Sequence, residues 1–114
     1  MKYVFLLMIS LLAWPAAAQE WQFAGQAPTA EQTKDWQQQA AKQGKDLMLV
    51  LGANWCHDST ALLERFNQSP FRDQLKQQYQ IHTVDVSYFE RGYDIVQAYG
   101  EPIYYGTPTV LMAN

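Results

Sequence analysis

The chain of 114 residues is long enough for one small domain and too short for two. It carries 8 basic and 11 acidic residues, and this net charge of −3, with no basic run, argues against a nucleic-acid partner. The chain has a single cysteine, Cys56, which excludes a fold stapled by internal disulfides.

The first residues have the pattern of a secretory signal peptide. Lys2 precedes an almost unbroken apolar run over residues 4–12, and three alanines ending at Ala18 fit an A-x-A cleavage site. The run is short for a membrane span, and no cysteine follows the cleavage site to carry a lipid. We therefore predict a signal peptide over residues 1–18, a mature domain over residues 19–114, export to the periplasm or the medium, and no stable membrane anchor.

The domain is expected to begin with a lead-in and a helix. Trp21 and Phe23 alternate with polar residues, as in a brief strand. Thr29, with a glutamine three residues later, fits a capping box, in which both side chains satisfy N–H groups of the first helical turn. The helix is expected to run to about residue 43, because Gly44 suits its left-handed end.

The rest of the chain alternates between strand and helix patterns. Residues 47–51 read LMLVL, which is typical of a strand buried on both faces. One helix is expected near Cys56; Ser69 and Pro70 fit the cap and first position of another, on which Tyr79 continues an i+4 apolar spacing. A strand, a helix and a strand follow over residues 81–86, 93–99 and 109–113. This alternation predicts an α/β fold whose two long strands are parallel.

Cys56 is the residue most suited to chemistry. It comes just after the buried strand and at the start of a helix, where backbone N–H groups and the helix dipole stabilise a thiolate. Ser59 follows one turn later, and its hydroxyl can face back and donate a hydrogen bond to the sulfur. Trp55 can shield one side, and a protonated His57 would favour the thiolate further. The alternative is a buried, inert structural cysteine.

Two short stretches together carry a family resemblance. Trp55-Cys56-x-x-Ser59 after a buried strand, with Gly106-Thr107-Pro108-Thr109-Val110 downstream, resembles the thioredoxin superfamily and its exported bacterial members. The resemblance implies a central mixed sheet flanked by helices, with Cys56 as the nucleophile and Pro108 as a cis-proline beside it. It also implies that Thr107 offers backbone groups to an extended substrate.

The sequence departs from the family pattern in several places. Ser59 stands where a resolving cysteine is usual, and Val50 stands where thioredoxins carry a buried acid. Tyr104 and Tyr105 lengthen the loop before the proline; they form a substrate platform or cover the core. After residue 113 the family pattern continues with a further strand and helix, which we expect this domain to lack.

These features predict thiol–disulfide exchange with one sulfur. Cys56 can form a mixed disulfide, but an external thiol must resolve it. Partners are then cysteine-containing proteins or small thiols such as glutathione, and no cofactor or metal is expected, because Cys56 and His57 have no second ligand cluster. The alternative is a thioredoxin fold that binds extended peptides without turnover, as a chaperone-like module.

Overall fold

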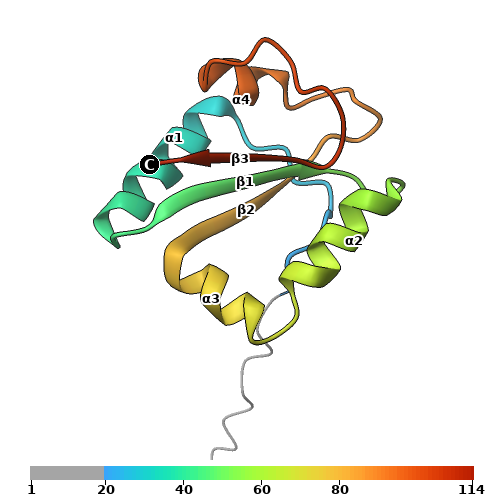
Figure 1. Ribbon diagram of the computed structural model, residues 1–114. Helices are drawn as coiled ribbons and strands as arrows, with labels where there is room; N and C mark the ends of the chain where they lie inside the picture. Colours follow the sequence, from blue (N-terminus) through green and yellow to red (C-terminus); the bar gives the residue numbers. More distant parts are fainter. Residues whose placement is uncertain (1–19) are drawn as a thin grey trace, which may run out of the picture.

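The computed structural model describes residues 20–114, so the predicted signal peptide lies outside the described part of the chain (Figure 1). The elements in chain order are α1 Ala30–Lys42, β1 Asp46–Gly52, α2 His57–Phe66, α3 Phe71–Gln78, β2 Tyr79–Asp85, α4 Tyr93–Ala98 and β3 Thr109–Ala113. Among the described helices, none has the length and apolar character needed to cross a membrane.

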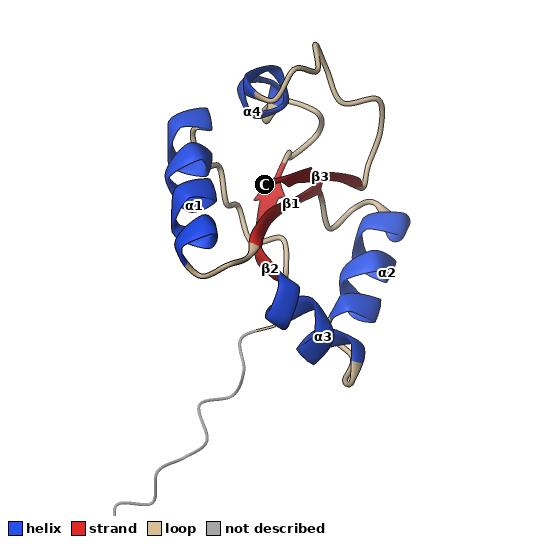
Figure 2. Cartoon of the chain, turned by 60° about the vertical axis from the view of Figure 1, so that its left-hand side comes forward, coloured by secondary structure: helices blue, strands red, loops and turns tan. Residues whose placement is uncertain are grey.

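The strands of the described region form a mixed sheet in the order β2-β1-β3. The central strand β1 runs parallel to β2, with Met48 opposite Ile81, and antiparallel to β3, with Val50 opposite Val110. Helices α1 and α4 lie on one side of the sheet, and α2 and α3 lie on the other (Figure 2). The predicted α/β fold with parallel long strands is confirmed.

The alternation of side chains along β1 divides the core in two. Leu47, Leu49 and Leu51 pack with residues of α4 on one face, whereas Met48 and Val50 pack with residues of α2 and α3 on the other. All five side chains are buried. Burying one such side chain contributes about 1.5–3 kcal/mol, so a strand that is apolar at every position anchors both helical layers.

The Thr29 half of the capping box predicted for α1 is confirmed. Thr29 is extended at the N-cap position, and its hydroxyl accepts a hydrogen bond of 3.1 Å from the backbone N–H of Gln32. Gly44 follows the helix with a φ of 69°, in the left-handed region that favours glycine. Local capping chemistry thus sets both ends of α1.

The predicted start of β2 and of α3 is wrong by one or two residues. Tyr79 does not continue α3; its backbone is extended (φ −129°, ψ 143°) and begins β2. Its ring still packs against the apolar cluster between the sheet and helices α2 and α3, so a strand residue makes the contact that was predicted for a helix residue. Pro70 is the N-cap residue of α3 and not its first helical residue.

The predicted lead-in strand is also wrong. Across the described part of the chain, the segment with Trp21 and Phe23 pairs with no strand. Instead, the Asn67 side chain binds the backbone of Trp21, accepting from its N–H and donating to its carbonyl, both at 2.9 Å. The Asn67 side chain, which follows α2, therefore binds the two backbone groups of Trp21 that pairing with a strand would have satisfied.

Candidate active site

Cys56 occupies the N-cap position of α2, in an extended conformation with φ −89° and ψ 113°. Its backbone N–H donates to the carbonyl of Ala53 at 3.1 Å, and its own carbonyl accepts from the N–H of Thr60 at 3.2 Å. The N-cap side chain is the one that faces the unpaired N–H groups of the first helical turn. The turn between β1 and α2 therefore aims the sulfur at a set of hydrogen-bond donors.

These surroundings lower the pKa of the Cys56 thiol. The Ser59 hydroxyl makes the largest contribution, followed by the side chain of Thr107; the backbone N–H groups of Ser59 and Asp58 add smaller ones. Partial burial raises the pKa, less strongly than the two side chains lower it but more strongly than either backbone group does. The sulfur is half-buried, so the thiolate is both stabilised and accessible.

The Ser59 hydroxyl is placed where it can donate a hydrogen bond to a thiolate at Cys56. Its side chain is completely buried, yet among residues 20–114 its Oγ has no hydrogen-bond partner. A buried hydroxyl without a partner is costly, and a charged sulfur at Cys56 supplies the missing acceptor. Gly52 makes room for it, because a Cβ on that residue would lie 2.7 Å from Ser59 Oγ and 2.6 Å from the ring of Phe23.

The loop before β3 brings the sequence-distant part of the site to the sulfur. Cys56 Sγ lies 3.5 Å from the carbonyl oxygen of Thr107, and the Thr107–Pro108 peptide bond is cis. This carbonyl holds the proton of the neutral thiol, whereas the Thr107 hydroxyl favours the thiolate. Thr107 and Pro108 also line a groove of about 740 Å³ that continues along β3 to Met112.

The two residues that flank Cys56 differ in their contacts. Trp55 is 46% exposed, and its indole N–H donates to the carbonyl of Ser87 at 2.6 Å. His57 is exposed at the start of α2, and in the described structure no hydrogen bond or ring contact joins its imidazole to another residue. Nor is it among the groups that lower the pKa of Cys56, so the expected support from His57 is not found.

The neighbouring tyrosines Tyr104 and Tyr105 have different roles. Tyr104 is 5% exposed, stacks on Tyr93 with ring centroids 4.6 Å apart, and donates its hydroxyl to the carbonyl of Arg91 at 2.7 Å. Burial raises its pKa, chiefly through desolvation, so it stays neutral. Tyr105 is 80% exposed beside Thr107 and at the groove. Both tyrosines line the groove, but Tyr104 is mainly a core residue, whereas Tyr105 is exposed there.

Sequence reasoning missed an aromatic contribution from the loop after β2. Tyr88 is 71% exposed and stacks on Trp55, with centroids 5.9 Å apart and ring planes 8° from parallel. Phe89 is 43% exposed and meets Trp55 edge-on at 5.2 Å. The only signal in the sequence was the density of aromatic residues.

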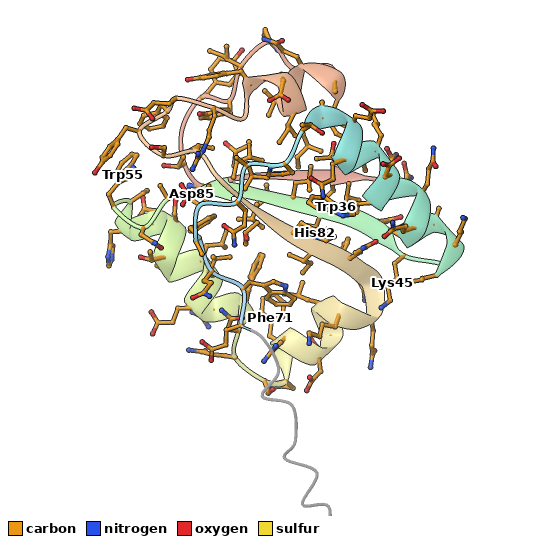
Figure 3. All side chains as sticks on the ribbon, turned by 180° about the vertical axis from the view of Figure 1, so that it is seen from behind. Trp36, Lys45, Trp55, Phe71, His82 and Asp85 are labelled. Carbon is orange, nitrogen blue, oxygen red and sulfur yellow. The ribbon has the colours of Figure 1, made fainter. Side chains whose placement is uncertain are left out.

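The other histidine lies away from this chemistry. His82 stacks on Trp36 with ring centroids 3.7 Å apart, and desolvation lowers its pKa. Figure 3 shows the pair over the sheet, apart from Trp55. Within residues 20–114 no group of three histidine, cysteine or acidic side chains is arranged to hold a metal ion.

Comparison with known proteins identifies the family. A family model described as thioredoxin-like matches residues 28–114, and the chain belongs to that family. The crystal structure of a disulphide isomerase from Xylella fastidiosa Temecula1 is similar, with 30% sequence identity and a TM-score of 0.72 over 85% of this chain and 74% of that one. No curated protein matches the chain.

Proposed function

We propose that this protein catalyses thiol–disulfide exchange with Cys56 as its single nucleophile. The observation that carries the proposal is the placement of a half-buried cysteine at the N-cap of α2, near the buried Ser59 and 3.5 Å from the Thr107 carbonyl, where the pKa of the thiol is lowered. A thiolate is the form that attacks a disulfide. The likeness to a disulphide isomerase supports the same chemistry.

The first step forms a mixed disulfide. The Cys56 thiolate attacks one sulfur of a client disulfide; a bond forms between Cys56 Sγ and that sulfur, and the other client sulfur leaves as a thiolate. Because Ser59 has no sulfur, the adduct cannot be resolved within the motif. A second thiol is therefore required to release Cys56 from the mixed disulfide.

Two kinds of thiol can complete the reaction. In isomerisation, another thiolate of the client attacks the client sulfur of the adduct, forms a new client disulfide and releases Cys56, with no net oxidation or reduction. In reduction, a small thiol such as glutathione attacks Cys56 Sγ and releases the client thiolate; a second small thiol then frees Cys56 and forms the oxidised small-thiol disulfide.

The test is to trap the adduct. Purified protein is incubated with a disulfide-containing client, blocked with acid and separated under non-reducing conditions. Wild type should accumulate mixed disulfides that a small thiol releases, and Cys56→Ser should form none. Ser59→Cys should lower the trapped fraction, because a second sulfur can displace the client and form a 56–59 disulfide. Wild type that traps nothing would contradict the proposal.

We further propose that this chemistry takes place in the periplasm or outside the cell. The support is the signal-peptide pattern of residues 1–18. Intact-mass analysis of the exported protein should give Gln19 as the N-terminal residue. A functional protein that keeps Met1 in the cytoplasm would contradict export.

A peptide-binding module without turnover is the second candidate. The groove of about 740 Å³ along Thr107, Pro108 and β3 is the observation that favours it. In that case peptides without cysteine should bind wild type and Cys56→Ser with the same affinity, and no adduct should be trapped.

A further inference from the structure

An exposed aromatic surface adjoins the nucleophile. Trp55 directly precedes Cys56, Tyr88 stacks on Trp55, and Phe89 meets it edge-on; we call these three residues the aromatic platform. Their exposed fractions are 46%, 71% and 43%. Exposed apolar residues scattered singly are ordinary, but contiguous ones mark an interaction surface.

The backbone under the platform is held in an uncommon conformation. Ser87 and Phe89 have φ values of 56° and 61°, in the left-handed region that is costly for residues other than glycine. Several contacts maintain it. The carbonyl of Ser87 accepts from the Trp55 indole at 2.6 Å, and the carbonyl of Phe89 accepts from the Tyr93 hydroxyl at 2.8 Å.

Further bonds fix both ends of the same loop. The Asp85 carboxylate accepts from the backbone N–H of Ser87 at 2.9 Å, and the Arg91 Nε–H donates to the Asp85 carbonyl at 2.7 Å. Figure 3 shows Asp85 and Trp55 together at one end of the sheet, away from Lys45 at the other. The fold thus holds a strained loop in a conformation that exposes Tyr88.

We propose that Tyr88 is a specificity-determining residue, which packs against an apolar side chain next to the reacting cysteine of a polypeptide client. The inference rests on the proposed function and adds the class of client. A client sulfur bonded to Cys56 brings the residues next to it within reach of Trp55, which directly precedes Cys56, and of Tyr88, which stacks on Trp55. Rigid aromatic rings gain contact there at low entropic cost, because they are already ordered.

The platform therefore distinguishes clients by what flanks the cysteine. A segment with phenylalanine beside its cysteine covers Tyr88, whereas a segment with serine, or a small polar thiol, leaves the ring in water. Contacts between aromatic rings give about a 2- to 10-fold preference. The selected client is an extended polypeptide with an apolar residue beside its disulfide cysteine.

The test uses two matched peptides, one with phenylalanine and one with serine beside a cysteine that carries thionitrobenzoate as a mixed disulfide. Attack by Cys56 on the peptide sulfur releases coloured thionitrobenzoate and leaves a peptide adduct that mass spectrometry identifies. Wild type should react about 2- to 10-fold faster with the phenylalanine peptide. Tyr88→Ser should bring the ratio of the two rates close to one.

Phe71→Ser is the control. Phe71 is a partly exposed ring on α3 that also packs on another ring, that of Phe66, and it lies apart from Trp55 in Figure 3. This variant should keep the wild-type ratio of the two rates. Three outcomes would overturn this inference but not the proposed function: a ratio of rates near one in wild type, a wild-type ratio in Tyr88→Ser, or an equal slowing of both peptides in that variant. Wild type that reacts with neither peptide would instead contradict the proposed function.

Discussion

Two loops reach the region of Cys56, and each exposes a tyrosine, but the structure holds them differently. In the first loop, residues 87–91, Tyr88 stacks on Trp55, and several neighbouring backbone groups are bound by side chains from other elements. In the second loop, residues 101–106, Tyr105 is more exposed than Tyr88 and has no ring contact within residues 20–114. Both tyrosines are exposed, but of the two only Tyr88 packs against another ring in the described structure.

The second loop is fixed at its ends and at the buried Tyr104, whose hydroxyl binds the Arg91 carbonyl, but less at the residues on either side of Tyr104. Thr109 Oγ1 donates to the carbonyl of Gly106 at 2.7 Å, and Gln97 Nε2 donates to the carbonyl of Pro102 at 3.1 Å. Between these bonds lie Ile103 and Tyr105, 44% and 80% exposed. The contrast indicates that the first loop presents a preformed surface, while the second lines a groove that a substrate can fill.

The largest effect that separates the two loops should come from Asp85→Ala. Its carboxylate accepts from the backbone N–H groups of Gly25 and Ser87, both at 2.9 Å, and Arg91 lies 3.8 Å away. Hydrogen bonds to a charged group contribute about 1.5–3 kcal/mol, so the free energy of unfolding should fall by about 2–3 kcal/mol in urea denaturation.

Glu101→Ala, at the start of the second loop, is the control for that experiment. Glu101 is exposed, and in the described region no hydrogen bond or ion pair involves its carboxylate. Its free energy of unfolding should stay within about 0.5 kcal/mol of wild type. Equal losses in both variants would show that the loops are held alike.

A smaller effect is expected from Trp55→Phe, which keeps an aromatic ring but removes the donor to the Ser87 carbonyl. The free energy of unfolding should fall by about 1 kcal/mol, and residues 87–91 should become more open to proteolysis. Tyr105→Phe should change neither quantity, because the Tyr105 hydroxyl has no hydrogen bond in the part of the chain that the structure describes. Cleavage of Trp55→Phe at the wild-type rate would contradict the claim that the Trp55 hydrogen bond holds the first loop.

The sequence predicted what local chemistry decides. The continuous apolar run became β1, the Thr29 cap began α1, and Cys56 fell at the start of α2 beside Ser59. Each of these follows from propensity, capping or spacing within one or two turns. The contact between Cys56 and Thr107 was available only through the family resemblance, since 51 residues separate them.

The sequence could not predict what tertiary contacts decide. Tyr79 suits a helix by spacing and a strand by its ring, and pairing with Asp46 of β1 selects the strand. The positive φ values of Ser87 and Phe89 have no local signal, because neither residue is a glycine. They are accompanied by a bond from Trp55, 32 residues away along the chain, and by one from Tyr93 at the start of α4, four residues after Phe89.

The smallest predicted effect is the pH dependence of stability that Cys56 contributes. Cys56 lies between the two loops, because it follows Trp55 and contacts Thr107. Because folding lowers its pKa, the unfolded chain binds more protons between the folded pKa and the ordinary cysteine value of about 8.5. The free energy of unfolding should therefore rise with pH across that window in wild type. Cys56→Ser, which keeps a good N-cap residue, should lack this rise; the same rise in both would assign it to another group.

The pH dependence of Cys56 alkylation by iodoacetamide tests the account most directly. The rate follows the thiolate fraction, so wild type should reach half-maximal rate below the value of about 8.5 that a free cysteine shows. Ser59→Ala should shift the midpoint upward, because the Ser59 hydroxyl is the main cause of the lowered pKa. A wild-type midpoint at or above that of a free cysteine, unmoved by Ser59→Ala, would contradict the assignment of Cys56 as an activated nucleophile.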